Sequence, residues 1–132
     1  MKYFLLIFML TLNLSKAFGQ SSDRTYLWHG HHYGSTYSYQ VSQITIHSDS
    51  TYTWKVWIMN IKKEWKTYKQ YVPQISKGKI TRNGKFYNLT EYRNGNKTDY
   101  DWKIKIMDRR LKFYYLNIKE KLKLGAKYKR IE

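Results

Sequence analysis

Short runs in which apolar and polar residues alternate cover most of this 132-residue chain, and they restrict its fold more than any other feature. Residues 52–58 place large apolar side chains at every second position, and residues 100–106 repeat that pattern with lysine and aspartate between. A period of two is the period of a β-strand with one buried face. The single proline, Pro73, interrupts neither run. The alternation therefore predicts an all-β protein.

Turn-forming residues separate these runs at intervals typical of β-hairpins. They are Ser48-Asp49-Ser50, Asn83-Gly84, Asn94-Gly95 and Asp108-Arg109-Arg110. Asn and Gly accept the positive φ angles of a type I′ turn, which joins neighbouring antiparallel strands. With a last strand over residues 122–131, we expect an antiparallel meander of about eight or nine strands. A meander of this length must close or curl to remove its edges, so we expect a closed or half-open up-and-down barrel.

One segment, residues 61–72, fits two kinds of secondary structure. Ile61, Trp65, Tyr68 and Val72 have the spacing of an amphipathic helix, and the same segment also alternates acceptably as a strand. Strands flank it on both sides, and its aromatic residues favour a pleated surface. We therefore expect a strand here, with a short helix as the alternative.

The N-terminal residues have the layout of a secretory signal peptide. A charged start at residues 1–3 is followed by an apolar run over residues 4–14 and by small residues at Ala17 and Gly19. The apolar run is too short to span a bilayer, which takes roughly 20 residues. We expect cleavage after Gly19, leaving a single domain over residues 20–132 with no transmembrane segment. The mature protein is then exported, to the periplasm or outside the cell.

The remaining domain is strongly basic and contains no cysteine. Removal of Lys2 and Lys16 with the signal leaves 23 Lys and Arg against 9 Asp and Glu, a net charge of +14. Such a charge favours an anionic polymer or an anionic envelope surface as partner. Base composition is the alternative source, since Lys, Ile, Asn and Tyr all have AT-rich codons. The missing cysteines exclude disulfides, thiolate metal sites and cysteine nucleophiles.

Several strand and turn patterns together resemble those of a known group of proteins. They are Ile44-Thr45-Ile46 leading into a Trp-bearing strand, Ser76–Ile80, Phe86–Leu89 and the closing Tyr128–Ile131. In these patterns the chain resembles small exported lipocalin-like (calycin-like) β-barrel proteins of the Bacteroidetes type. The resemblance implies a barrel fold and an exported location, and such proteins mostly lack an assigned function. The Gly-X-Trp signature of true lipocalins is absent, and Trp28 lies instead in a Trp-His-Gly sequence.

Two sets of residues are candidates for binding, one on each face of the expected strands. Basic and aromatic residues on outward-facing positions would form a surface for an anionic partner: Lys55, Trp57, Lys103, Lys105, Lys112 and Tyr114. An ordinary barrel exterior is the alternative for this set. Inward-facing residues would line a cavity for a small apolar ligand, as in a lipocalin-like carrier: Trp54, Val56, Ile58, Trp102 and Ile104.

Metal binding has one weak signal. His29, His31 and His32 lie close together in the sequence, but on a strand His32 would point away from the other two. A closed site would need a further ligand, such as His47 or Asp49. We therefore predict no metal site and no cofactor.

Catalytic signals are also weak. A small, basic, exported ribonuclease or toxin would use an acid–base pair such as His47 and Glu91, with Arg82 or Arg93 on the phosphate. No spacing singles these residues out. Asp99 and Asp101 lie too close along one strand to flank a glycosidic bond. We therefore expect a non-enzymatic binding protein that engages an anionic partner through its basic aromatic surface. A carrier of a small apolar ligand and a secreted ribonuclease or toxin are the alternatives.

Overall fold

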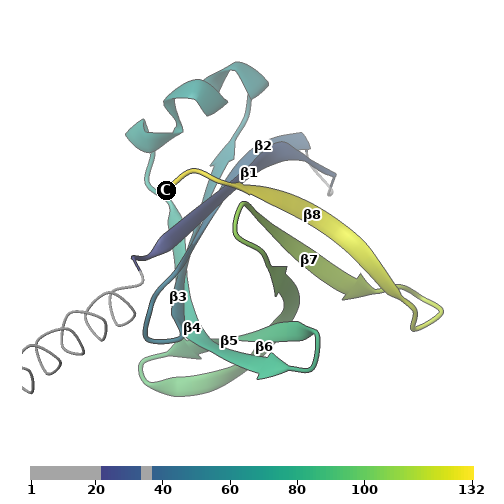
Figure 1. Cartoon of the computed structure of the whole chain (residues 1–132). Helices are drawn as coiled ribbons and strands as arrows, with labels where there is room; N and C mark the ends of the chain where they lie inside the picture. The colour runs from purple at the N-terminus through teal and green to yellow at the C-terminus, as the bar shows by residue number, and fades with distance from the viewer. Residues whose placement is uncertain (1–21, 34–36) are drawn as a thin grey trace, which may run out of the picture.

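The computed structural model describes residues 22–33 and 37–132, which form one closed β-barrel (Figure 1). Each strand pairs antiparallel with the next along the chain, and the first pairs with the last. The strands are β1 (Arg24–Tyr33), β2 (Tyr37–Ile46), β3 (Thr51–Met59), β4 (Gln74–Asn83), β5 (Phe86–Arg93), β6 (Asn96–Ile106), β7 (Arg110–Leu116) and β8 (Leu122–Arg130). This confirms the predicted all-β, antiparallel up-and-down barrel.

The turns lie where the sequence predicts them. Asn94 and Gly95 both have positive φ angles, 51° and 78°, as a type I′ turn requires. The other Asn-Gly turn differs in detail, because Asn83 is still the last residue of β4 and the loop consists of Gly84 and Lys85. Of these two loop residues only Gly84 has a positive φ, 61°.

The barrel closes along a short seam between β1 and β8. Only two residue pairs join these strands, Tyr26 with Arg130 and Leu27 with Lys129. Backbone hydrogen bonds extend the seam past the end of β8, since the Ile131 amide donates to the Thr25 carbonyl over 2.8 Å. This seam has fewer residue pairs than any other strand pairing of the barrel. Figure 1 shows β8 crossing the front of β1 there.

Apolar side chains from strands all around the barrel fill much of its interior. The buried cluster contains Tyr26, Ile44, Tyr52, Leu89, Ile104, Leu111 and Tyr128. The hydroxyl of Tyr26 donates to the carbonyl of Met107 over 2.6 Å, which satisfies its polar end. Burial of this many large side chains stabilises a domain that has no disulfide.

The expected strand over residues 61–72 is wrong. The segment contains 3₁₀-helical structure, η1 (Lys62–Gln70), which is kinked at Thr67 and lies outside the barrel against β2 and β3 (Figure 1). Tyr68 and Trp65 pack there against an apolar patch on the outer side of those strands, which includes Val41, Trp57 and Met59. The helical spacing of Trp65 and Tyr68 suits this role, because both rings must face the same patch.

Two residues of β3 differ from their expected exposure. Trp57 was expected to face solvent, but η1 covers it, so that it is only 5% exposed. Its ring meets that of Tyr68 edge-on at 4.8 Å, and its Nε1 donates to the Tyr71 carbonyl over 2.9 Å. Ile58 was expected inside the barrel, but it lies near the end of the strand and is 50% exposed.

No helix in residues 22–33 and 37–132 is long and apolar enough to cross a membrane. The expected signal peptide and its cleavage site lie outside the described residues.

Candidate functional site

A pocket of about 550 Å³ opens at the end of the barrel where β5 turns into β6. Strands β3, β4, β5 and β6 supply its lining. Its large apolar walls are Trp54, Val56, Ile75, Tyr100 and Trp102. Its polar and charged lining includes Ser76, Lys77, Glu91 and Arg93. A pocket of this size, mostly apolar with a few polar groups, is typical of sites for small molecules.

The aromatic wall of the pocket is held in a defined geometry. The rings of Trp54 and Trp102 meet edge-on with centroids 4.9 Å apart, and Tyr100 stacks on Trp102 at 6.1 Å. Trp54 is fixed from behind, because its Nε1 donates to the hydroxyl of Ser42 over 2.6 Å. The Ser42 hydroxyl also bonds the Tyr128 hydroxyl over 2.6 Å. This wall is therefore formed before any ligand arrives.

The buried hydroxyl of Tyr128 remains protonated at ordinary pH. Burial raises the pKa of Tyr128 to about 12, although its hydrogen bond with Ser42 acts in the opposite direction. A neutral hydroxyl can both donate and accept, so it completes the network behind Trp54.

A buried carboxylate and an exposed guanidinium form an ion pair at the pocket. Glu91 is 5% exposed, and Arg93 Nε donates to its Oε1 over 2.7 Å. This hydrogen bond and the charge of Glu91 raise the pKa of Arg93. The pairing of β5 with β6 shifts register between Thr90 and Tyr92, next to Glu91. Since Arg93 neutralises Glu91, Lys77 adds an uncompensated positive charge to the pocket lining.

Two buried hydroxyls close to the pocket lack a hydrogen bond of normal geometry within the described part of the chain. They belong to Tyr52 and Ser76. Burial raises the pKa of Tyr52 to about 12; the nearby Ser76 hydroxyl lowers it and the Glu91 charge raises it further. An unsatisfied buried hydroxyl costs about 1–3 kcal/mol. Ser76 also lines the pocket, so its hydroxyl is available to form a hydrogen bond with a ligand.

The structure brings together three of the five residues predicted to line a cavity. Trp54, Val56 and Trp102 line the pocket, whereas Ile104 is fully buried in the core and Ile58 lies at the exposed end of β3. Sequence reasoning missed Tyr100 and Ser76. The period of two places Tyr100 on the same face as Trp102, so the pattern contained a signal for it, but Ser76 is found only from the pairing of β3 with β4.

The predicted basic and aromatic surface is divided. Lys103, Lys105, Lys112 and Tyr114 lie together on the outer face of β6 and β7, where Lys103 pairs with Tyr114 and Lys105 with Lys112. Lys55 lies on β3 between Gln43 and Ile75, and Trp57 is covered by η1.

Phe86 joins the basic cluster on β6 and β7, although the sequence did not point to it. Its ring meets Tyr114 edge-on at 5.1 Å. The ammonium groups of Lys103 and Lys105 lie over it at 5.3 and 5.0 Å from the ring centre. These cation–π contacts hold both lysines beside the two rings on the outer face of the sheet.

His29 and His31, near the N-terminus, have partners on β2 and η1. His29 Nδ1 is hydrogen-bonded to the Tyr39 hydroxyl at 2.6 Å, and its ring stacks on Trp65 at 3.9 Å. His31 meets the Tyr39 ring edge-on at 5.0 Å. Among the described residues, which include His32, no three His, Cys, Asp or Glu side chains are grouped to hold a metal ion.

Protonation of His29 should lower stability in mild acid. Burial lowers its pKa in the folded protein, and the charges of Lys62 and Lys129 lower it further. The unfolded chain then takes up the proton first, so the free energy of unfolding should fall as the pH drops below about 6.5. Denaturant titrations from pH 7.5 to 5 should show a smaller fall in His29→Asn than in the wild type. An equal fall in the free energy of unfolding in both proteins would contradict this role for His29.

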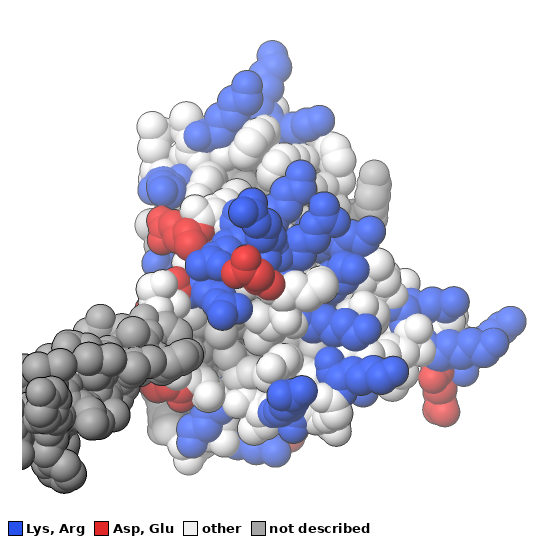
Figure 2. Space-filling view, viewed as in Figure 1, with Lys and Arg blue, Asp and Glu red and all other residues white. Residues whose placement is uncertain are grey.

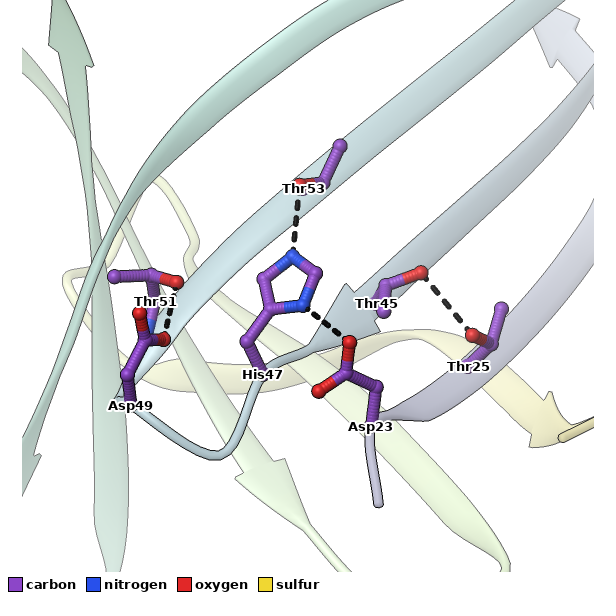
Figure 3. Close-up of polar contacts among 7 residues, drawn as sticks. All are labelled: Asp23, Thr25, Thr45, His47, Asp49, Thr51 and Thr53. Carbon is purple, nitrogen blue, oxygen red and sulfur yellow. Dashed lines mark hydrogen bonds and ion pairs between the residues drawn. The ribbon is translucent and has the colours of Figure 1, made fainter.

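A second polar cluster lies at the opposite end of the barrel, beside the turn between β2 and β3 (Figure 3). His47 Nδ1 contacts Asp23 Oδ2 at 2.8 Å, and its Nε2 contacts the Thr53 hydroxyl at 2.9 Å. The hydroxyls of Thr25 and Thr45 pair beside it at 3.1 Å. This cluster ties the start of β1 to the turn between β2 and β3.

The acid–base pair considered for a ribonuclease does not form one site. His47 lies at the turn between β2 and β3, whereas Glu91 lies near the turn between β5 and β6. In an up-and-down barrel these two turns are at opposite ends. Arg93 pairs with Glu91, far from His47.

The fold and the pocket define a closed, eight-stranded antiparallel β-barrel with an aromatic end pocket, an architecture consistent with a lipocalin-like fold. No protein-family model, no curated protein and no solved structure matches this chain.

Proposed function

We propose that this protein is a non-enzymatic binding protein that holds a small, largely apolar ligand in the end pocket. The observation that carries the proposal is the preformed aromatic wall of Trp54, Trp102 and Tyr100 around a pocket of about 550 Å³. Rigid aromatic walls contribute a large apolar contact area at little cost in conformational entropy. The buried cluster fills much of the interior beyond the pocket, so the ligand lies near the mouth.

The charges at the pocket favour a ligand with an acidic group. Glu91 is neutralised by Arg93, and Lys77 adds a positive charge to the lining. The net positive charge of the chain attracts anions from a distance. A ligand with an apolar body and one carboxylate would place its body against the tryptophans and its acid near Lys77 and Arg93.

The proposed role is that of a carrier or scavenger outside the cytoplasm. The proposed location depends on residues 1–19, which have the charged, apolar and small-residue regions of a signal peptide. The resemblance to small exported lipocalin-like proteins supports the same location.

Binding should be measurable with a fluorescent fatty acid that carries a dansyl group. We expect saturable binding and displacement by unlabelled fatty acid. Trp102→Ala should weaken the affinity by about tenfold or more, because it removes a large part of the apolar wall.

Trp65→Ala is the matched control, because Trp65 lies on η1 outside the pocket. It should leave the affinity within about twofold of the wild type. Equal losses in the two variants, or no saturable binding of any apolar acid, would contradict the proposed function. Lys77→Gln leaves the Arg93–Glu91 pair intact, and it should weaken the fatty acid more than the matching alcohol if the acid lies at the charged side of the pocket.

A further inference from the structure

The hairpin formed by β7 and β8 extends away from the barrel (Figure 1). Large apolar side chains are exposed at its end. Ile118, in the turn, is fully exposed, and Leu116 is 65% exposed. Leu116 lies directly opposite Leu122, and Tyr114 opposite Leu124, so these four side chains share one face of the hairpin. Leu122 and Leu124 are also exposed. The end of the hairpin is therefore an exposed apolar surface, which usually marks an interaction site.

The turn that carries Ile118 is well ordered by hydrogen bonds. The side-chain oxygen of Asn117 accepts from the Lys119 and Lys121 amides at 3.0 and 2.9 Å. The Asn117 amide donates to the Lys121 carbonyl over 3.0 Å. Glu120 has a positive φ of 58°, which lets the chain reverse within this short loop. The hydrogen bonds of the turn thus keep the Ile118 side chain exposed to solvent.

Lysines surround the apolar residues at the end of the hairpin. Lys119, Lys121 and Lys123 line a hollow of about 370 Å³ together with Asn117 and Ile118. None of these three lysines lies within 4 Å of a carboxylate in the described part of the chain, where the ion pairs are formed elsewhere. A hollow with three free ammonium groups suits a phosphate group.

The same sheet continues this positive charge toward the barrel. Lys105 lies directly opposite Lys112 across β6 and β7, and Lys112 lies opposite Lys127 across β7 and β8. Like charges on directly opposite residues destabilise a sheet unless anions neutralise them. We call Lys105, Lys112 and Lys127 the lysine row. Figure 2 shows basic side chains over the face that β7 and β8 present, out to the end of their hairpin, where one acidic side chain also lies. Glu120 is the acidic residue of that turn, so the three lysines beside it leave a net charge of +2 there.

We propose that the β7–β8 hairpin docks this protein on an anionic lipid bilayer. Ile118 and Leu116 enter the interface between headgroups and acyl chains, and the lysines beside them bind headgroup phosphates. The lysine row lies on the same outer face and adds attraction to the anionic surface.

The shape and composition of the hairpin favour a bilayer over other anionic partners. A protein partner would need a groove that fits a narrow hairpin end, whereas a bilayer accepts it without one. A nucleic acid would stack its bases on exposed ring faces. The face of Phe86 instead carries Lys103 and Lys105, and the exposed residues at the hairpin end are mostly aliphatic.

Vesicle co-sedimentation tests the proposal, using the chain from Gln20 onward, which contains all eight strands and lacks the apolar run of residues 4–14. We expect binding to phosphatidylcholine vesicles that contain about 30% phosphatidylglycerol, and binding about tenfold weaker to phosphatidylcholine alone. Ile118→Ser should weaken binding about fivefold or more. Val72→Ser is the matched control, since Val72 is 93% exposed on another part of the molecule, and it should have no effect.

Two triple variants distinguish binding through the hairpin lysines from attraction by the overall positive charge of the protein. Changing Lys119, Lys121 and Lys123 to Gln should weaken binding about tenfold. Changing Lys62, Lys63 and Lys66 on η1 to Gln removes the same charge and should weaken it less than threefold. Equal losses in the two triple variants would overturn the proposal.

Insertion is detected with one fluorophore, because the chain has no native cysteine. Ile118→Cys labelled with an environment-sensitive dye should show blue-shifted emission on anionic vesicles, and labelled Val72→Cys should not. Binding without that shift would show that Ile118 does not insert into the bilayer.

Tighter binding to dextran sulfate or to single-stranded RNA than to vesicles, at matched charge concentration, would overturn the bilayer as partner. A dimer in solution that buries the label would assign the hairpin to self-association instead.

Discussion

Replacement of Gly78 by alanine should destabilise the barrel by about 3 kcal/mol or more. Gly78 lies in β4, directly opposite Tyr52 on one side and Glu91 on the other. A β-carbon at this position would lie 1.9 Å from the Thr90 carbonyl oxygen and 2.8 Å from the Tyr52 ring. Neither neighbour can yield, because one is backbone in a paired strand and the other is a fully buried ring.

Gly125→Ala is the matched control for this substitution. Gly125 also lies within a strand, and a β-carbon there would come no closer than 3.3 Å to the Phe113 carbonyl oxygen. We expect its free energy of unfolding to stay within about 1 kcal/mol of the wild type. Urea titrations followed by circular dichroism measure both values. A Gly78→Ala protein as stable as Gly125→Ala would show that β4 and β5 can separate at this point.

Replacement of Ser42 by alanine should cost about 1–3 kcal/mol, because it removes the hydroxyl that joins the Trp54 Nε1–H to the buried Tyr128 hydroxyl. The Trp54 Nε1–H and the Tyr128 hydroxyl both bond the Ser42 oxygen over 2.6 Å. The same change releases Trp54, which forms part of the pocket wall. Apolar ligands should therefore bind more weakly to this variant at temperatures where it remains folded.

Tyr128→Phe is the comparison for Ser42→Ala. It removes one hydroxyl but leaves Ser42 to accept from Trp54, so we expect a loss of about 1 kcal/mol and unchanged ligand affinity. Denaturant titration and ligand titration on the two variants test the expectation. If Tyr128→Phe costs more than Ser42→Ala, the network does not depend on Ser42 as the shared hydrogen-bond partner.

The strands and turns were predictable because they follow from local residue patterns. Alternation over residues 52–58 and 100–106 marks the inner face of β3 and β6, and Asn94-Gly95 marks a turn that needs positive φ. Closure was expected on the general ground that a long meander must protect its edges.

The helix was mispredicted because its role depends on residues far away in the sequence. Trp57 and Val41 form an apolar patch on the outer side of the barrel, where alternation alone predicts contact with solvent. Such a patch requires a cover, and Trp65 and Tyr68 of η1 provide it. The local secondary-structure propensity of residues 61–72 does not depend on the apolar patch on β2 and β3, so it could not indicate that a helix would cover that patch.

The pocket could be predicted only in part, because it depends on register. Period-two reasoning placed Trp54 and Trp102 on inner faces, but it could not show that both lie at the same end of the barrel. The irregular pairing beside Glu91 is also invisible in the sequence. Similarly, Lys105 and Lys112 were predicted to share a face, but their direct opposition follows from the pairing of β6 with β7.

The seam between β1 and β8 has a consequence for the order in which this protein folds. Every other pairing joins strands that are neighbours in the sequence, so each hairpin can form as soon as its second strand is synthesised. The pairing of Tyr26 with Arg130 instead joins the two ends of the domain. No partial chain that lacks β8 can complete the ring, so the barrel closes only after the last strand has been made.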